Sequence, residues 1–312
     1  MPILDRDAIR ADFDRDGYAV ARGLFSREEI AEFRRRVQVV RERELREGRN
    51  IHREAAYPNV VYVMGDVLAR HELEDVAYVV FDPRVQDLVR ALVGPSPVYW
   101  GDSSVQVGGS GQGWHRDNVH RTAHGDDWAG GRYDVIRVGV YLQDHSRHSG
   151  GVKIGAGSHA AVENRGTPRN VGVEPGDVAV WTLRTYHSAN FVRLKGFPDA
   201  CLPPIVERFI PGFLRVPEER ERMSIFCSFG GQGAHTDRYI AYQAARADAR
   251  EYFRRSCLGP AASKTLGAAG VEFRRPIPEY GELHACAPAE TPAARPKAAS
   301  APQQPGDPSG AG

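Results

Sequence analysis

Long apolar stretches and an excess of charge of one sign are both missing from this 312-residue chain. No run of about 18 apolar residues is present, so we expect no transmembrane helix. The 41 basic and 40 acidic side chains leave a formal net charge of +1. Proteins that bind nucleic acid usually carry a basic excess. We therefore expect neither a membrane span nor a nucleic-acid partner.

Cysteine is also scarce, and its spacing excludes two kinds of small scaffold. The four cysteines (Cys201, Cys227, Cys257 and Cys286) are far apart and form no C-x-x-C pair. This pattern fits neither a disulfide framework nor a zinc ribbon, and it predicts four reduced thiols. The segment Met1–Asp7 is charged and has no apolar core, so we expect no secretory signal peptide. These observations predict a cytoplasmic protein.

Helical patterns flank a central region that is rich in short β-strand patterns. We predict helices over residues 5–16, from a capping box at Ser26–Glu29, from Asp82 to Gly94, and after Thr236. A short strand is expected at residues 18–21. Between residues 97 and 230, apolar runs alternate with Gly-rich turns, which indicates a β-sandwich or barrel. The predicted runs are Val98–Trp100, Ser104–Val107, Val135–Leu142, Val152–Ile154, Val178–Leu183 and Met223–Phe229.

The predicted fold class is α+β, with a double-stranded β-helix (jelly-roll) core flanked by N-terminal and C-terminal helices. We predict a single domain over residues 1–285. Within it, residues 194–219 are rich in Pro and are interpreted as an insertion, either a lid or an oligomer contact. Residues 286–312 are rich in Ala, Pro, Gly, Ser and Gln, a composition typical of a disordered tail.

One tripeptide and one distant histidine are candidates for a metal site. In Trp114-His115-Arg116-Asp117, the residues at i and i+2 of an extended segment point the same way, so His115 and Asp117 can share a side. His187 follows the apolar strand around residues 178–183 and is placed to be a third ligand. Two histidines and one carboxylate on one face are the usual ligands of non-haem Fe(II). An isolated H-x-D is common by chance, so the signal depends on this context.

The segment Arg222–Ser228 alternates polar and apolar residues, so Arg222 and Ser224 share one face of a strand. A buried arginine requires an anionic partner. A dicarboxylate co-substrate would provide a bidentate one.

Taken in order, several short motifs resemble the phytanoyl-CoA dioxygenase-like branch of the Fe(II)/2-oxoglutarate-dependent oxygenases. The resemblance extends from about residue 10 to about residue 230. The motifs are Phe13–Tyr18, Gly23–Ile30, Trp114–Asp117, Val138–Asp144, Ser149–Gly151, Gly157–His159, Gly176–Asp177 and His187. The resemblance implies Fe(II) bound by His115, Asp117 and His187, with 2-oxoglutarate and O2 as co-substrates. It also implies Arg222 as the anchor of the distal carboxylate of 2-oxoglutarate, supported by Ser224.

Two positions depart from the family pattern. The anchoring arginine usually follows the distal histidine by about a dozen residues, whereas Arg222 follows His187 by 35. Arg193 and Arg220 are the alternatives, and we favour Arg222 because it opens the apolar strand. The second departure is Arg116, a charged residue between the two ligands, which is expected either to contact a substrate anion or to face solvent.

Other polar residues are weaker candidates. We expect Gln106 in the co-substrate or substrate site, and Asp102, Arg116 and Tyr133 near the substrate. For His159 we favour a turn-stabilising hydrogen bond over metal binding. His120 and His124 are interpreted as a polar lip of the site, and His145 and His148 as part of a solvated hairpin.

The sequence therefore predicts a dioxygenase that hydroxylates a small polar metabolite or natural-product intermediate. The resemblance makes halogenation the less favoured outcome, because the carboxylate ligand Asp117 is intact. Desaturation, cyclisation and epimerisation use the same ligands and stay open. The alternatives from other classes are a non-catalytic barrel that binds a small molecule or a partner, and a zinc enzyme that uses His115, His120 or His124. The oligomeric state is not predicted.

Overall fold

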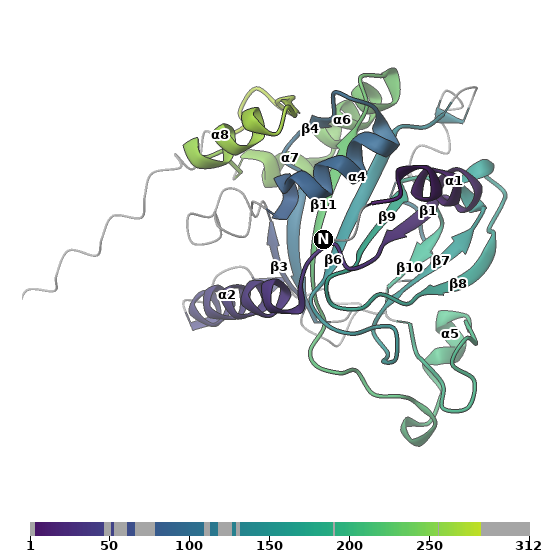
Figure 1. The fold of residues 1–312 in the computed structure, drawn as a ribbon. Coiled ribbons are helices and arrows are strands. Elements are labelled where there is room, and N and C mark those ends of the chain that lie inside the picture. The colour runs from purple at the N-terminus through teal and green to yellow at the C-terminus, as the bar shows by residue number, and fades with distance from the viewer. Residues whose placement is uncertain are drawn as a thin grey trace, which may run out of the picture.

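Two β-sheets pack against each other, and helices cover the outer face of the larger one (Figure 1). The structure is a computed structural model that describes residues 4–46, 51–52, 61–65, 79–108, 113–117, 127–128, 132–189, 191–254 and 256–281. Mixed helices and sheets confirm the predicted α+β class. None of the described helices has the length and apolar composition needed to cross a membrane.

The first helix and strand begin and end as predicted. Helix α1 (Arg6–Asp16) is capped by the Asp5 carboxylate, which accepts a hydrogen bond from the Ala8 amide at 3.0 Å. Gly17 ends the helix with a φ of 79°, a conformation that L side chains rarely adopt. Strand β1 (Tyr18–Ala21) follows at once and pairs with β9 (Val178–Thr182).

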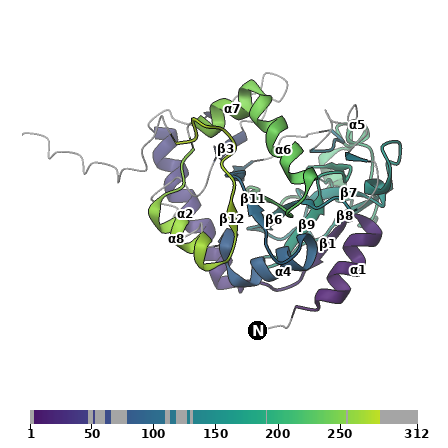
Figure 2. The ribbon, with the colours of Figure 1, turned by 90° about the horizontal axis from the view of Figure 1, so that it is seen from above.

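Two further helices follow from local capping chemistry. Helix α2 (Arg27–Arg46) begins with the predicted capping box: the Glu29 amide donates to the Ser26 hydroxyl at 3.1 Å, and the Ser26 amide donates to the Glu29 carboxylate at 2.7 Å. Helix α4 (Pro83–Val93) begins at the predicted Asp82 cap. Both helices place apolar side chains against the large sheet, and Figure 2 shows them beside it from above.

The large sheet is built around a central antiparallel strand, β11. Its order is β1-β9-β6-β11-β5-β3-β2, with β4 pairing β11 and β12 pairing β4. Ser224 of β11 lies opposite Tyr141 of β6 on one side and Gln106 of β5 on the other. The strands not yet bounded are β2 (Ile51–His52), β3 (Val61–Gly65), β4 (Val98–Tyr99), β5 (Ser103–Val107), β6 (Val135–Tyr141), β11 (Met223–Gly230) and β12 (Glu272–Phe273).

The two faces of this sheet pack against different partners. Val138 and Val180 belong to the core under the helices, whereas Ala179 and Trp181 pack toward the small sheet. The alternation follows from the two-residue period of a strand. The side chains between the two sheets therefore include Tyr141 of β6, Ala179 and Trp181 of β9, and Phe226 of β11.

The small sheet has the order β10-β7-β8, with β7 (Val152–Ala156), β8 (Thr167–Val171) and β10 (His187–Ser188). Val152, Ile154 and Val171 close the apolar cluster against Trp181 and Phe226 of the large sheet. Neither β8 nor β10 was predicted. The sequence Thr-Pro-Arg-Asn-Val of β8 is largely exposed and lacks a β-strand pattern.

Residues 194–219 form a lobe beside the small sheet, where Figure 1 shows α5 (Pro204–Glu207) below β7 and β8. A short 3₁₀ helix, η6 (Gly212–Leu214), follows. A buried ion pair between Lys153 of β7 and Glu207 of α5 joins the lobe to the sheet. The lobe exposes several large apolar side chains: Phe197, Ile205, Val206, Phe209, Phe213 and Leu214. The prediction that it is a lid or an oligomer contact stays a prediction.

The C-terminal part contributes α6 (Ala234–Ala245), α7 (Ala247–Arg254) and α8 (Pro260–Ala268). The prediction of four reduced thiols is wrong for Cys257, which is disulfide-bonded, while Cys201 and Cys227 are free. Two distant cysteines can pair once the chain is folded, and their spacing in sequence does not reveal this. Cys286 and the predicted disordered tail lie outside the described residues.

Candidate metal centre

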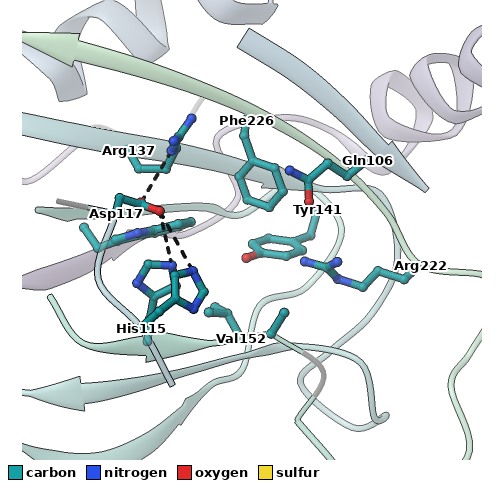
Figure 3. A pocket seen from close by; sticks show the side chains of 11 residues that line it. Gln106, His115, Asp117, Arg137, Tyr141, Val152, Arg222 and Phe226 are labelled. Atoms are coloured by element: carbon teal, nitrogen blue, oxygen red, sulfur yellow. Dashed lines mark ion pairs between the residues drawn. The ribbon is translucent and has the colours of Figure 1, made fainter. Parts of the chain in front are cut away.

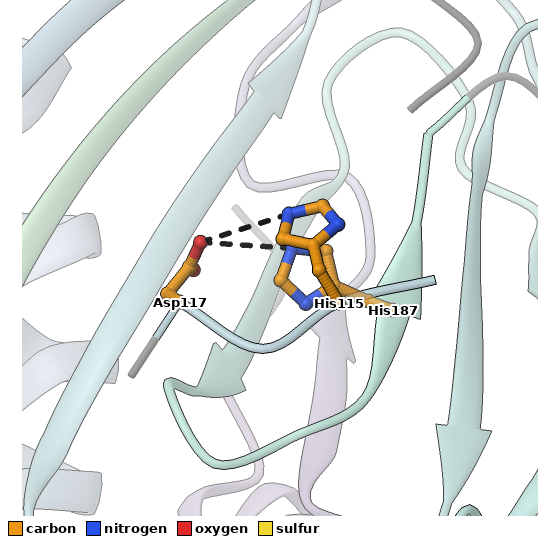
Figure 4. Close-up of side chains that lie close together, drawn as sticks. All are labelled: His115, Asp117 and His187. Atoms are coloured by element: carbon orange, nitrogen blue, oxygen red, sulfur yellow. Dashed lines mark ion pairs between the residues drawn. The ribbon is translucent and has the colours of Figure 1, made fainter. Parts of the chain in front are cut away.

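The two candidate histidine ligands are neighbours in an antiparallel pair. His187 begins β10, and its backbone pairs with that of His115 through two hydrogen bonds, each with an N–O distance of 2.8 Å. Asp117 follows two residues after His115 and points the same way (Figure 4). One Oδ of Asp117 lies 4.0 Å from His115 Nε2 and 3.8 Å from His187 Nε2. The ligand atoms of the three side chains all lie within 4.8 Å of one another, close enough to hold one metal ion.

Backbone carbonyls fix the tautomer of both imidazoles. His115 Nδ1 lies 2.9 Å from the Gly113 carbonyl oxygen, and His187 Nδ1 lies 3.0 Å from that of Thr185. A carbonyl can only accept, so each Nδ1 carries a proton and donates. The lone pair is then on Nε2, which faces Asp117, as a metal ligand requires. Burial lowers the pKa of His187 to about 4, although the Asp117 charge opposes this shift.

A buried arginine faces the other oxygen of the candidate carboxylate ligand. Arg137 of β6 places its Nε 3.7 Å from Asp117 Oδ2 and its Nη1 3.2 Å from Asp102 Oδ1. Asp117 Oδ2 has no hydrogen-bond partner of its own. Burial raises the pKa of Asp117, but the charges of His187 and Arg137 outweigh it and hold this pKa below its usual value. The carboxylate is therefore ionised and ready to bind a cation.

The three side chains open into a cavity between the two sheets (Figure 3). Apolar and aromatic groups from both sheets form its walls, including Val152, Trp181 and Phe226. The other lining residues are Gln106, His115, Asp117, Arg137, Tyr141, His187, Ala189 and Arg222. The cavity is thus polar at its ends and apolar along its sides.

The end of the cavity away from the histidines carries one cationic side chain and two uncharged polar ones. Figure 3 shows Arg222, Gln106 and Tyr141 gathered there. Arg222 is 5% exposed, and its Nε has no hydrogen-bond partner. The buried hydroxyls of Tyr141 and Ser224 also lack one. Burial raises the pKa of Tyr141 to about 12 despite the nearby Arg222 charge, so this phenol stays a hydrogen-bond donor at neutral pH.

Several residues predicted for the site lie elsewhere. Arg116 is buried, and it donates to the carbonyl oxygens of Arg184, Ser158, Ala161 and Asn164. Its guanidinium therefore holds backbone segments together and does not line the cavity.

Asp102 and Tyr133 also fall outside the lining of this cavity. Asp102 reaches it only through Arg137, while Tyr133 lines a separate cavity beside α1. Among the alternative anchors, Arg193 donates to the Pro198 carbonyl and Arg220 pairs with Glu219 on the surface. Neither of these two arginines lines the cavity that contains His115, Asp117 and His187, which is called the metal-side cavity below.

The remaining histidines are not ligands in the described part of the chain. His159 places its Nε2 3.2 Å from the Asp14 carbonyl of α1, so its hydrogen bond joins two distant segments and is not the turn-stabilising bond that was predicted. The prediction of a solvated hairpin is wrong for His145, which is 1% exposed and bonded to Gln143 and Ser149. Residues 144–149 fold back toward Arg222, and this tertiary contact is not visible in the local sequence. His120 and His124 lie outside the described residues.

Sequence reasoning missed Arg137 and Tyr141. Both lie on β6 and are separated by an even number of residues, so their side chains point to the same face of the sheet. The sequence does contain one indication, which is the charged Arg137 inside the apolar run Val135–Leu142. A charged side chain in a buried strand requires a partner of opposite charge or a hydrogen-bond acceptor.

Comparison with known proteins adds a family assignment. The profile of the family described as phytanoyl-CoA dioxygenase matches residues 13–193, more than half of the chain, which includes His115, Asp117 and His187. No curated protein sequence matched the chain.

Two solved structures share the fold. One is AviO1 from Streptomyces viridochromogenes Tue57, at 20% identity and a TM-score of 0.50, covering 75% of this chain and 98% of that one. Another is SnoK, described as a non-haem α-ketoglutarate-dependent carbocyclase from nogalamycin biosynthesis, at 16% identity and a TM-score of 0.50, covering 76% and 93%. At these identities the similarity concerns the fold alone, whereas the profile match assigns the family. The chain belongs to the phytanoyl-CoA dioxygenase family.

Proposed function

We propose that the protein is an Fe(II)- and 2-oxoglutarate-dependent dioxygenase, with His115, Asp117 and His187 as the metal ligands. The observation that carries the proposal is the convergence of two Nε2 lone pairs and one ionised carboxylate within 4.8 Å. Two imidazoles and one carboxylate on one face leave the opposite positions open, which suits non-haem Fe(II). Family membership supports the same chemistry. We further propose that the two packed sheets form the double-stranded β-helix expected from the sequence.

The far end of the cavity suits the distal carboxylate of 2-oxoglutarate. A buried guanidinium with an unpaired Nε is costly unless an anion binds it, and the unpaired hydroxyls of Tyr141 and Ser224 can donate to the same oxygens. Gln106, opposite Ser224 in the register, adds an amide donor. We therefore assign Arg222, rather than Arg193 or Arg220, as the anchor.

When bound, Fe(II) with 2-oxoglutarate and O2 supplies an oxidant that removes hydrogen from an unactivated carbon. The protein contributes geometry. The Gly113 and Thr185 carbonyls orient the two imidazoles, and Arg137 holds the second oxygen of Asp117. Trp181, Val152 and Phe226 keep water from the walls of the cavity. Shielding of this kind protects a reactive site from side reactions.

For the reaction outcome we propose hydroxylation of a small polar metabolite or natural-product intermediate. The polar side chains in the lining of the cavity, such as Arg137 and Gln106, support a polar substrate. Cyclisation, epimerisation and desaturation use the same ligands, and SnoK, with a similar fold, is described as a carbocyclase. The outcome depends on where the substrate carbon lies, so product analysis has to decide it.

The test is an anaerobic titration of metal-free protein with Fe(II) and 2-oxoglutarate, followed by visible absorption. We expect a metal-to-ligand charge-transfer band in the wild type and in an Asp87→Ala control, whose carboxylate lies on the surface of α4. The band should be absent from Asp117→Ala. A folded wild-type protein with no band would contradict the proposal and favour a non-catalytic binding protein.

A further inference from the structure

A second cavity lies on the other side of β9 from the metal ligands. Trp181 lines the metal-side cavity, and the next residue, Thr182, lines the second one, because successive strand residues point to opposite faces. The second cavity has a volume of about 240 Å³ and is bounded by α1, the 3₁₀ helix η5 (Ser158–Ala160), the end of β9 and residues 132–133. Pockets for drug-sized ligands have about 300–1,000 Å³, so this one suits a smaller molecule.

Among the residues that line this cavity, Arg184 has two nitrogens whose hydrogen bonding is incomplete, and His159 Nδ1 also lacks a partner. Arg184 is 8% exposed, and its Nε and Nη2 are buried without a hydrogen-bond partner. These two nitrogens form one edge of the guanidinium. That edge donates two parallel hydrogen bonds to the oxygens of a carboxylate or a phosphate. A buried cation left in this state is destabilising unless a ligand completes it.

The surroundings of Arg184 stabilise the faces of its guanidinium and leave this edge without a hydrogen-bond partner. The rings of Trp128 and Tyr133 lie 4.9 and 4.5 Å from the guanidinium carbon, so they make cation–π contacts. Such contacts do not satisfy N–H groups in the plane of the guanidinium. Thr182 can add one more donor, because its hydroxyl oxygen accepts from the Arg184 amide and its O–H remains available.

Nearby acids do not neutralise this arginine by direct contact. Asp127 attracts Arg184 through space, but its carboxylate is bonded to Arg238 Nε at 3.0 Å. Asp14, which lines the cavity, uses one oxygen for Arg10 at 2.8 Å and the other for Arg132 at 3.3 Å. Asp134 also acts on Arg184 only through space. Among the described lining residues, Arg132, Arg184 and Asp14 leave one net positive charge.

We propose that this second cavity is a binding site for the oxyanion group of a small molecule, a carboxylate or a phosphate, which Arg184 holds through Nε and Nη2. Arg132, whose side chain is 34% exposed, also lines the cavity and forms an ion pair with Asp14 there. The site is separate from the metal centre and does not depend on iron. Its test can therefore succeed or fail independently of the proposed oxygenase activity.

The experiment is isothermal titration calorimetry of the metal-free protein at low ionic strength, with inorganic phosphate in one arm and acetate in the other. Arg222 is a second possible anion site in the metal-free protein. The wild type is therefore compared with Arg222→Gln and Arg184→Gln. We expect an anion site that persists in Arg222→Gln and is at least about tenfold weaker in Arg184→Gln, which corresponds to about 1.4 kcal/mol. The arm with the tighter binding identifies the phosphate or the carboxylate as the preferred group.

Two further variants keep the test decisive. Arg132→Gln should weaken binding several-fold and changes only an exposed side chain, so it serves if Arg184→Gln fails to fold. Arg220→Gln is the matched surface control and should bind as the wild type does. The proposal is overturned if Arg184→Gln binds as tightly as the wild type, if all binding disappears in Arg222→Gln, or if neither anion binds at millimolar concentration.

Discussion

The backbones of His115 and His187 donate hydrogen bonds to each other in both directions, with both N–O distances at 2.8 Å. The two residues are 72 positions apart in the chain. Their ring centroids are 4.3 Å apart, so both Nε2 atoms reach the same point beside Asp117. A metal ion at that point would connect the start of β10 to the segment that carries Asp117.

Metal binding should therefore stabilise the folded protein. A ligand that binds only the folded state at about 100 times its Kd adds about 2.7 kcal/mol to the free energy of unfolding. For a domain of this size, that corresponds to a rise in Tm of about 4–5 °C. Thermal unfolding with a chelator and with Ni(II), a redox-stable substitute for Fe(II), measures the effect. Asp117→Ala should abolish the rise and Asp87→Ala should keep it; an equal rise in both variants would place the metal elsewhere.

Arg222→Met should weaken 2-oxoglutarate binding strongly. Each hydrogen bond to a charged group contributes about 1.5–3 kcal/mol, so losing the bidentate contact should raise the Kd at least about tenfold. Titration of the charge-transfer band with 2-oxoglutarate gives this Kd. Arg220→Met is a close control, since Arg220 is two residues away, on the surface, and paired with Glu219. A larger effect from Arg220 than from Arg222 would reassign the anchor.

Much of this site could be predicted because it depends on short-range geometry. The pair at His115 and Asp117 needs only the two-residue period of an extended chain, and His187 follows a recognisable apolar strand. The capping box at Ser26 and Glu29 is local in the same sense. Each of these features is determined within a few residues, so the sequence alone predicts it.

The direction of side chains between the two sheets could not be predicted in the same way. Arg116 lies between two ligands in the sequence, yet it points away and bonds to four backbone carbonyls. Tyr133 lies two residues before β6 and lines the cavity beside α1. Arg137 and Tyr141 reach the metal side only because β6 pairs with β9 and β11 in this register. These placements depend on tertiary packing, which the local pattern of a single sequence does not reveal.

Arg137→Met should reduce metal affinity without removing a ligand. Arg137 contacts Asp117 and is itself held by Asp102, so its loss frees the carboxylate and leaves two partly buried acids without their shared cation. Changes to groups that orient metal ligands typically cost 10–100-fold in affinity. Competition titration with a metal indicator measures the Kd for Ni(II). Arg137→Lys should recover part of the affinity through its charge, and an unchanged Kd in Arg137→Met would rule out a positioning role.

Lys153→Met should destabilise the fold, and a second substitution should reverse much of the loss. The Lys153 side chain is fully buried, and its partner Glu207 is 6% exposed, so removal of the amine leaves an unpaired buried carboxylate. Breaking a buried pair typically costs about 3–5 kcal/mol. Urea unfolding of both single variants and of Lys153→Met with Glu207→Leu forms a double-mutant cycle. Additive losses in the double variant would show that the two groups do not interact.

His145 should make the protein less stable as the pH falls below neutrality. Burial, together with the charge of Arg222, lowers the pKa of His145 to about 3 in the folded state, against 6.5 for the free side chain. Between these values the unfolded chain binds a proton that the folded chain excludes, so acid favours unfolding; above pH 6.5 the effect disappears. The slope approaches about 1.4 kcal/mol per pH unit.

Urea unfolding of the metal-free protein at pH 7 and pH 5 tests this dependence against a His145→Gln variant. The glutamine keeps a polar side chain at the position and does not titrate. The wild type should lose more stability between the two pH values than the variant, by on the order of 2 kcal/mol. Equal losses would mean that His145 is protonated in the folded state, which its contacts oppose: Nδ1 donates to the Ser149 carbonyl, and Nε2 accepts from the Gln143 amide at 2.6 Å. A proton on Nε2 would remove that acceptor and place a second cation beside Arg222.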